Sequence, residues 1–261
     1  MTLSIRGLNA GYGRVKVLHD VTVDPIKPGE FVGLIGPNAS GKSTLFKSLS
    51  GLLTPSAGSI ELNGSDLTTF TRRDRSRAIA YMPQAYGCNA ILTVYESVLL
   101  ALKQTTGWRV ESDNLDIVSR TLSALRLTHL ANRGLGNLSG GQAQMVAVAQ
   151  TLVRNPRIVL LDEPTSALDL HHQLSILSSV RSEMKQRGSI VMAALHDLNL
   201  AAEFCDRLIL IKDGMIMADG QPADILALPQ IGETYRVETA LEATRRGSLY
   251  VDATLRGAAV C

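Results

Sequence analysis

The chain has 261 residues, and Lys plus Arg total 26 against 24 for Asp plus Glu, which leaves a net charge of +2. This near balance argues against a general nucleic-acid binder held by phosphate contacts, and no apolar stretch reaches the roughly 18 to 20 residues that span a bilayer. The length suffices for one large α/β domain, the N-terminus lacks the layout of a secretory signal, and the widely spaced Cys88, Cys205 and Cys261 favour a reducing cytoplasm.

The first 30 residues read as β-strands, at residues 3–8 and 15–23, with Ala10-Gly11-Tyr12-Gly13 between them. The apolar run of residues 31–35 follows without polar alternation, as expected of a central parallel strand. The chain is therefore predicted to start with a β region that leads into a buried parallel strand.

Residues 36–44 come directly after that strand and combine glycines, one lysine and two hydroxyls. Glycine lets backbone amides converge on phosphate oxygens, Lys42 would neutralise the β- and γ-phosphates, and Ser43 would supply an oxygen to Mg²⁺. The alternative is a Gly-rich turn before a core helix. We predict ATP and Mg²⁺ binding by this phosphate loop, which consists of Gly36, Pro37, Asn38, Ala39, Ser40, Gly41, Lys42, Ser43 and Thr44.

Leucines at positions 45, 49 and 52 predict a helix after the phosphate loop, ended by Gly51 and Pro55. Helix and strand signals then alternate, which predicts a mostly parallel sheet. Arginines 72, 73, 75 and 77 cluster beside Asp74, and we interpret them as a solvated helix face, with docking to a partner as the alternative.

Residues 93–135 interrupt this alternation because their apolar residues recur only at helical spacing, which predicts a helical insertion. Further on, Asp213-Gly214 between two apolar runs predicts a hairpin, whereas the tail beyond Pro222 shows no clear periodicity. Between the insertion and the tail we predict strands at residues 158–161, 189–195 and 207–211, and helices at about 170–187 and 197–205.

The strand at residues 158–161 ends in Asp162-Glu163-Pro164, and a run this apolar belongs in the interior. Because side chains alternate along a strand, the two carboxylates would point in different directions. We predict that Asp162 reaches the Mg²⁺ shell and that Glu163 faces a water as base or water-orienter. A solvated strand end is the alternative.

The pentapeptide Leu-Ser-Gly-Gly-Gln at residues 138–142 is the most specific motif of the chain. Ser139 is a candidate N-cap for a helix that Gly140 and Gly141 open, and a helix start rich in free amides can hold an anion. The phosphate loop already provides one such site, so a second one calls for a second molecule.

With this pentapeptide, the phosphate loop and the acidic pair in the right order over residues 3–228, the chain resembles the nucleotide-binding subunits of ATP-binding cassette (ABC) transporters. The resemblance implies one ABC ATPase domain over residues 1–261: an α/β phosphate-loop NTPase core with a mostly parallel sheet, an N-terminal antiparallel β subdomain, a helical subdomain at about 93–155, and a short tail at about 222–261.

The resemblance also implies a head-to-tail homodimer in which the pentapeptide of one copy closes over the ATP of the other. Three residues would contact the γ-phosphate across this dimer: Ser139, Gly140 and Gly141. Gln142 would also take part in nucleotide binding across the dimer, and Asp169 would line the interface.

Three further positions match the family pattern. Tyr12 would stack on adenine, Gln84 would touch Mg²⁺ or the attacking water, and His196 would hold the γ-phosphate and orient Glu163. Two of them have an ordinary structural alternative: a strand-edge tyrosine for Tyr12 and a satisfied polar group for His196. The implied metal ligands are thus Ser43, Gln84 and Asp162, and the implied catalytic residues are Glu163, His196 and Gln84.

The chain departs from the commonest family spelling in two places. Ala39 stands where most members have glycine, which would cost about 1 kcal/mol if that residue needs positive φ. Ala143 and Met145 stand where arginines are frequent, and nothing in the sequence explains that change.

His172-Gln173, His196-Asp197-Leu198-Asn199 and the tail around Tyr235 and Tyr250 are most similar to importers of ferric siderophores, haem and cobalamin. In such importers two cassettes bind two permease subunits at the cytoplasmic face of the membrane, and a separate binding protein delivers the chelate outside. A soluble cassette acting on DNA or ribosomes and a non-hydrolysing regulatory subunit are the alternatives. The intact Glu163 and His196 favour catalysis, and nucleic acid is not an expected partner.

Overall fold

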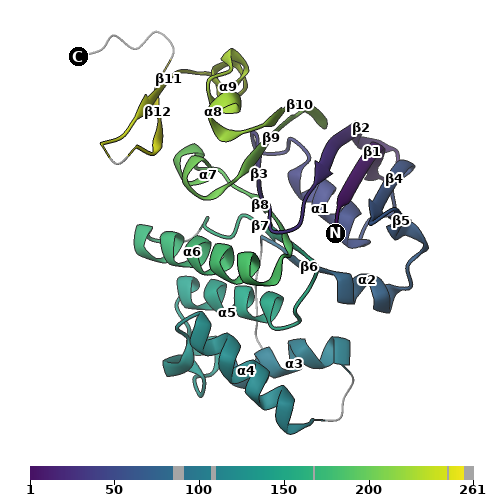
Figure 1. Cartoon of the computed structure of the whole chain (residues 1–261), viewed down its shortest axis with the longest axis vertical. Helices are drawn as coiled ribbons and strands as arrows, with labels where there is room; N and C mark the ends of the chain where they lie inside the picture. The colour runs from purple at the N-terminus through teal and green to yellow at the C-terminus, as the bar shows by residue number, and fades with distance from the viewer. Residues whose placement is uncertain (85–90, 107–109, 167, 246, 256–261) are drawn as a thin grey trace.

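The computed structural model describes residues 1–84, 91–106, 110–166, 168–245 and 247–255, so Cys88, Ala167 and Cys261 lie outside the described residues. A six-stranded sheet in the order β10-β9-β3-β8-β7-β6 forms its centre (Figure 1). Its neighbours pair in parallel except β9 with β10, so the predicted mostly parallel sheet is confirmed. The strands are β3 (Phe31–Ile35), β6 (Ile79–Met82), β7 (Ile158–Asp162), β8 (Ile190–Ala194), β9 (Arg207–Lys212) and β10 (Met215–Gly220).

The turn between β9 and β10 confirms the predicted hairpin. Asp213 and Gly214 have φ angles of 49° and 75°, the positive values that a tight two-residue hairpin turn requires. A Cβ on Gly214 would lie 1.8 Å from the carbonyl oxygen of Val17, so the hairpin packs closely against the N-terminal sheet.

The N-terminal region forms a separate sheet in the order β2-β1-β4-β5, and β1 pairs antiparallel with both of its neighbours. This confirms the antiparallel β subdomain, although β1 runs on to Tyr12 instead of ending near residue 8. Irregular pairing with β2 lets the strand continue through its glycines. The strands are β1 (Leu3–Tyr12), β2 (Val15–Ile26), β4 (Ala57–Leu62) and β5 (Ser65–Asp66).

Helix α1 (Lys42–Ser50) follows the phosphate loop and packs between the two sheets, with Leu45, Phe46 and Leu49 in the core. It ends at Gly51, which adopts the left-handed conformation of a helix C-cap. The prediction that Leu52 belongs to the same apolar face is wrong, because it follows the cap and is 68% exposed.

Helix α2 (Arg72–Ala78) carries the arginine cluster, and the interpretation as a solvated face holds only in part. Arg72 and Arg73 are exposed, whereas Arg75 is half-buried and donates hydrogen bonds to the carbonyls of Ser48 and Leu49 at 3.0 and 3.2 Å. Arg75 therefore satisfies free carbonyls at the end of α1.

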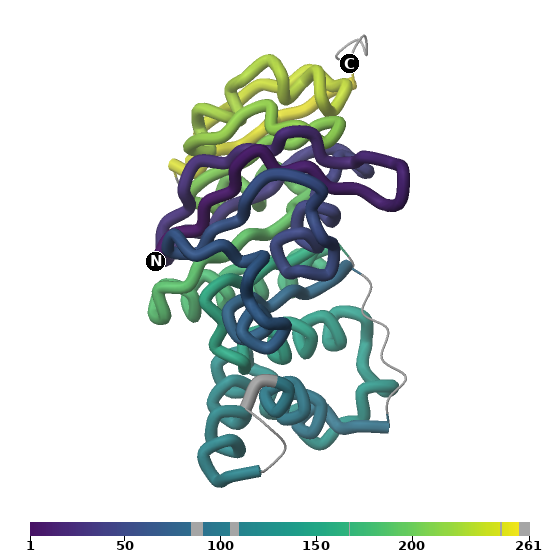
Figure 2. The backbone as a smooth tube through the Cα atoms, turned by 90° about the vertical axis from the view of Figure 1, so that its right-hand side faces the viewer, coloured from purple at the N-terminus to yellow at the C-terminus, as the bar shows by residue number. Residues whose placement is uncertain are grey.

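The helical insertion is confirmed and lies at one end of the molecule (Figures 1 and 2). Leu115, one of the apolar residues whose helical spacing predicted the insertion, is 40% exposed. Helices of the insertion and of the core that follows are α3 (Val94–Thr106), α4 (Ser112–Ala124), α5 (Gly140–Leu152), α6 (Leu170–Arg187) and α7 (Leu198–Phe204). In the described parts of the chain, every helix is too short or too polar to cross a membrane.

The C-terminal segment, for which the sequence showed no periodicity, is ordered into two short helices and a hairpin. Both helices have proline in the first turn, where its missing amide proton costs nothing. These elements are α8 (Pro222–Leu226), α9 (Pro229–Tyr235), β11 (Val237–Ala243) and β12 (Leu249–Leu255).

Candidate nucleotide-binding site

The carboxyl ends of four neighbouring strands, β3, β8, β7 and β6, meet at one edge of the central sheet. Because chain segments that leave parallel strands emerge at the same edge, the phosphate loop, His196, the acidic pair and Gln84 come together there. A cavity of about 650 Å³ opens at this edge. Its lining residues are Val17, Asn38, Ala39, Ser40, Gly41, Lys42, Ser43, Thr44, Gln84, Glu163 and His196.

The phosphate loop needs unusual backbone angles. Gly36 and Gly41 have φ angles of 149° and 108°, and a Cβ on Gly36 would lie 2.0 Å from the carbonyl oxygen of Ile211. Ala39 has a positive φ, of 62°, so the expected strain of about 1 kcal/mol for alanine at this position applies. The alanine keeps the amide donor at this position.

Lys42 is buried, and its ammonium donates to the loop's own carbonyls, Gly36 O at 2.7 Å and Pro37 O at 2.8 Å. Burial lowers the pKa of Lys42, while the negative charges of Glu163 and Asp162 act against that shift. The cation is thus held at the cavity floor, where phosphate oxygens can replace neutral carbonyl partners.

Asp162 is buried at the end of β7, and the Tyr81 hydroxyl donates to its Oδ2 at 3.1 Å. Burial raises the pKa of Asp162, while hydrogen bonding by the hydroxyls of Ser43 and Tyr81 opposes the shift. Among the described residues, its Oδ1 has no hydrogen-bond partner. A buried carboxylate oxygen without a partner, next to a serine hydroxyl, is a donor set that fits Mg²⁺.

At Glu163 the backbone is no longer extended, because its φ of 53° lies in the left-handed region. Its carboxylate lies between two side chains: Gln84 Nε2 donates to Oε2 at 2.5 Å, and His196 Nε2 lies 2.5 Å from Oε1. Glu163 therefore faces the cavity while Asp162 stays buried. A carboxylate oriented in this way can accept a proton from a water beside the phosphate loop.

Tyr12 lies at the end of β1 and is 47% exposed. The ammonium of Lys47 lies 5.6 Å from the centre of its ring, within cation–π range. Tyr12 is not among the residues that line the described cavity, so its stacking on adenine stays a prediction.

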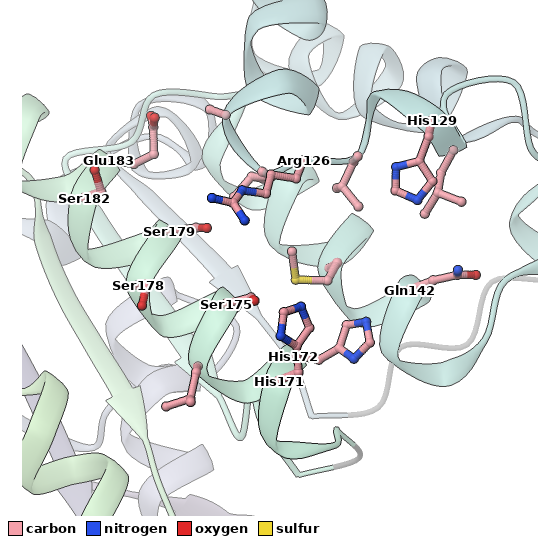
Figure 3. Close-up of a pocket in the computed structure, with 16 residues that line it drawn as sticks. Arg126, His129, Gln142, His171, His172, Ser175, Ser178, Ser179, Ser182 and Glu183 are labelled. Carbon is pink, nitrogen blue, oxygen red and sulfur yellow. The ribbon is translucent and has the colours of Figure 1, made fainter.

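The pentapeptide lies elsewhere. Ser139 is the N-cap of α5, as predicted, and it forms a capping box with Gln142. Gln142 lines a second pocket, of about 590 Å³, formed by α5, α6, the end of α4 and the residues that follow α4; Figure 3 shows it together with His171 and His172 of α6. Within one chain, the residues expected to contact ATP across a dimer are therefore not part of the phosphate-loop cavity.

Asp169, the expected interface residue, is an exposed N-cap of α6. Its carboxylate accepts from the His172 amide at 2.9 Å and lies 2.7 Å from His172 Nδ1. The hydrogen bonds from His172 lower the pKa of Asp169. Asp169 thus has a clear local role in starting α6.

Sequence reasoning missed three residues of this edge. Tyr81 binds Asp162, Tyr235 accepts from the Gly36 amide at 2.8 Å, and Gln144 donates to the Glu163 carbonyl at 3.0 Å. Gln144 links the helix of the pentapeptide to the strand end that carries Glu163. Tyr81 and Gln144 stand beside apolar residues and Tyr235 follows Glu233 and Thr234, and none of these sequence contexts assigns a partner.

A phosphate-binding loop at a strand end, a buried aspartate and an oriented glutamate define a phosphate-loop NTPase. The family model described as ABC transporter matches residues 18–166, more than half of the chain. The chain therefore belongs to the ABC transporter family, whose ATP-binding subunits hydrolyse ATP to drive transport.

Several relatives are import proteins. The hemin import ATP-binding protein HmuV of Pseudomonas entomophila is 37% identical, with 92% of this chain and 94% of the relative covered. The ferric enterobactin transport ATP-binding protein FepC of Escherichia coli is 35% identical, with 87% and 84% covered. The cobalamin import ATP-binding protein BtuD of Halobacterium salinarum is 35% identical over 92% of this chain, which spans only 60% of that relative.

Solved structures agree on the fold. An ATP-binding subunit of an ABC transporter has a TM-score of 0.76 at 29% identity, with 90% of this chain and 95% of that chain covered. A dimeric ATP-binding cassette in a post-hydrolysis state, bound to ADP and phosphate, has a TM-score of 0.76 at 28% identity, with 84% and 98% covered.

Proposed function

We propose that this chain is the ATP-hydrolysing subunit of an importer and couples ATP-driven dimer closure to uptake of an iron chelate, such as a ferric siderophore or haem. The names of the relatives support the direction of transport and this class of cargo. In this proposal two copies bind two permease subunits at the cytoplasmic face of the membrane, and an external binding protein delivers the chelate.

One observation carries the enzymatic part of the proposal: the Glu163 carboxylate lies between Gln84 and His196 at the wall of the phosphate-loop cavity. The loop amides and Lys42 bind the phosphates. Glu163 accepts the proton of the attacking water, and His196 and Gln84 keep its carboxylate in place. Ser43 and Asp162, with Gln84 nearby, would hold Mg²⁺, which would neutralise charge on the phosphate oxygens.

The second copy completes the site. The amides of Gly140 and Gly141 open α5 and lie outside the cavity of their own chain, so they can serve the γ-phosphate of a partner. Asp169 lines the same interface. Tyr12 stacks on the adenine ring of ATP. ATP thereby joins the two copies, and its hydrolysis loosens the dimer.

Two alternatives make different predictions. A soluble cassette acting on DNA or ribosomes would copurify with nucleic acid and not with a permease. A regulatory subunit would bind ATP without turnover, yet the arrangement of Glu163 and His196 favours hydrolysis. Identification of the metal chelate bound by the complex of this chain with its membrane partners tests the cargo directly.

Glu163→Gln is the central test. It removes the proton acceptor while keeping the shape of the side chain, so we expect ATP turnover to fall at least about a hundredfold. ATP binding, measured by calorimetry, should persist. Asp116→Asn also turns a carboxylate into an amide, at an exposed position of α4, and should leave turnover unaltered. Near-normal turnover in Glu163→Gln would remove Glu163 from its role.

Lys42→Ala tests the phosphate loop itself. Loss of the buried ammonium should abolish tight ATP binding, because no other cation lines the described cavity near the loop carbonyls. Lys185→Ala, on the exposed face of α6, is the matched control. Unchanged affinity in Lys42→Ala would contradict the assignment.

A further inference from the structure

The C-terminal segment, residues 222–255, contacts the nucleotide-binding edge at two places. The Tyr235 hydroxyl accepts a hydrogen bond from the Gly36 amide at 2.8 Å. The Asn199 side chain accepts from the Val251 amide at 2.7 Å and donates to the Val251 carbonyl at 3.4 Å. One contact reaches the first residue of the phosphate loop, and the other reaches the helix that follows His196.

Gly36 is a junction of several constraints. Its amide donates to Tyr235, its carbonyl accepts from the Lys42 ammonium at 2.7 Å, and the Ile211 carbonyl occupies the space where a Cβ would lie. The peptide units on both sides of Gly36 are therefore fixed, one by Tyr235 and the other by Lys42. A shift of the peptide unit that binds Tyr235 also moves the peptide unit that binds Lys42, because only the φ/ψ pair of Gly36 separates them.

Tyr235 is itself firmly placed. It ends α9, whose Ile231 is fully buried and whose Gly232 allows the Val237 carbonyl to approach closely. Arg236 then takes the left-handed conformation, with φ 60°, that ends the helix. Burial raises the pKa of Tyr235 to about 12, so the hydroxyl stays protonated at neutral pH.

Asn199 acts at the other side of the cavity. It lies in the first turn of α7, where Asp197 Oδ1 accepts from the amides of Asn199 and Leu200 at 2.8 and 3.1 Å. His196, directly before this cap, contacts Glu163. Val251 of β12 is buried, and its backbone binds the side chain of Asn199, three residues after His196.

We propose that the C-terminal segment is a positioning element for ATP binding and hydrolysis: Tyr235 holds the phosphate loop, and Asn199 holds the His196 turn. Neither side chain is among the residues that line the described cavity, so both act through others. A loop held in its binding conformation avoids the affinity loss that a partly populated conformation causes. This proposal rests on the proposed ATPase function.

Tyr235→Phe tests the first contact, because it removes one oxygen and keeps the ring. We expect ATP affinity, measured by calorimetry well below the melting temperature, to weaken about three- to tenfold. Hydrogen exchange of the Gly36 amide should become faster. Tyr250→Phe makes the same change at a tyrosine that is 45% exposed on β12, and it should alter neither measurement.

Asn199→Ala tests the second contact through the chemical step. We expect kcat to fall about three- to tenfold with a smaller change in ATP affinity, since the affected turn carries His196 and not the phosphate loop. Asn199→Asp keeps the acceptor for the 2.7 Å bond to Val251 and should recover most of the rate.

The outcomes separate the two proposals. Variants with lower melting temperatures but unchanged ATP affinity and kcat would reduce the segment to a purely structural role and overturn this inference. Failure of the unaltered chain to bind or hydrolyse ATP would instead overturn the proposed function, on which the inference depends.

Discussion

At the residue scale, the proposed Mg²⁺ ligand Asp162 carries a cost in stability. Burial raises its pKa above the usual value, so the ionised carboxylate is disfavoured in the folded chain. For such a group, the stabilising effect of the bound proton is complete below the unfolded pKa of about 3.9 and is lost as pH rises through the folded pKa. At neutral pH the charged Asp162 therefore destabilises the folded, metal-free protein.

We predict that Asp162→Asn raises the melting temperature of the metal-free chain at pH 7 by a few degrees. The gain should vanish at acid pH, where Asp162 is protonated in the original chain. Mg²⁺ with ATP should stabilise the original chain more than the variant. Thermal denaturation from pH 3 to pH 8 measures this, with exposed Asp116→Asn as control. The stability difference between Asp162→Asn and the original chain should be larger at pH 7 than at pH 4. A smaller difference at pH 7 would contradict the predicted cost of the buried charge.

The site residues that could be predicted from the sequence are those that belong to a short, contiguous motif. Lys42 and Ala39 follow from the spacing of the phosphate loop, and the structure places Ala39 at the positive φ that the glycine-rich pattern requires. The divergence of Asp162 and Glu163 was predicted from strand alternation, whereas its actual cause is the left-handed turn at Glu163. Tyr235 escaped prediction as a site residue because its partner Gly36 is 199 positions away.

At the element scale, α1 depends on a neighbour for its C-terminus. Gly51 provides the left-handed cap, and Arg75 of α2 donates to the carbonyls of Ser48 and Leu49. A Cβ on Gly51 would lie 2.7 Å from Cδ of Arg75, so the glycine also makes room for this side chain. The helix that starts at the phosphate loop is thus anchored at its far end by α2.

We predict that Arg75→Ala lowers the free energy of unfolding by about 1–2 kcal/mol, through the lost hydrogen bonds to these carbonyls and the lost packing of the side-chain stem. Urea denaturation measures the change. Arg73→Ala on the exposed face of the same helix is the matched control and should stay within about 0.5 kcal/mol of the original. Equal effects of the two substitutions would mean that Arg75 is only another solvated arginine.

Elements with a clear hydrophobic pattern or a characteristic turn sequence could be predicted from the sequence. β3 and α6 were placed at their observed bounds, and Asp213-Gly214 indicated the β9–β10 hairpin. The C-terminal helices α8 and α9 were not predicted, because five and seven residues are too few to show a helical period. Their positions depend on contacts with distant parts of the chain.

At the scale of the whole molecule, the pentapeptide lies outside the phosphate-loop cavity of its own chain, and the proposed dimer accounts for this separation. Among the described residues, and apart from its chain neighbours and the backbone of its own helix, no atom lies within 4 Å of a Cβ added to Gly140, so this side of the glycine is open. In the proposed dimer that space receives the γ-phosphate bound by the partner. A side chain there should therefore be tolerated by the monomer and excluded by the dimer.

We predict that the Glu163→Gln chain with ATP sediments as a dimer, and that adding Gly140→Gln returns it to a monomer that still binds ATP, since the blocked surface lies outside the phosphate-loop cavity. Gly136→Gln is the matched control: its added Cβ also meets open space, but it lies before the pentapeptide, so its dimers should persist. Analytical ultracentrifugation with and without ATP measures both variants. Dimers that survive Gly140→Gln would show that the two copies, if they associate, do not share their phosphates through this loop.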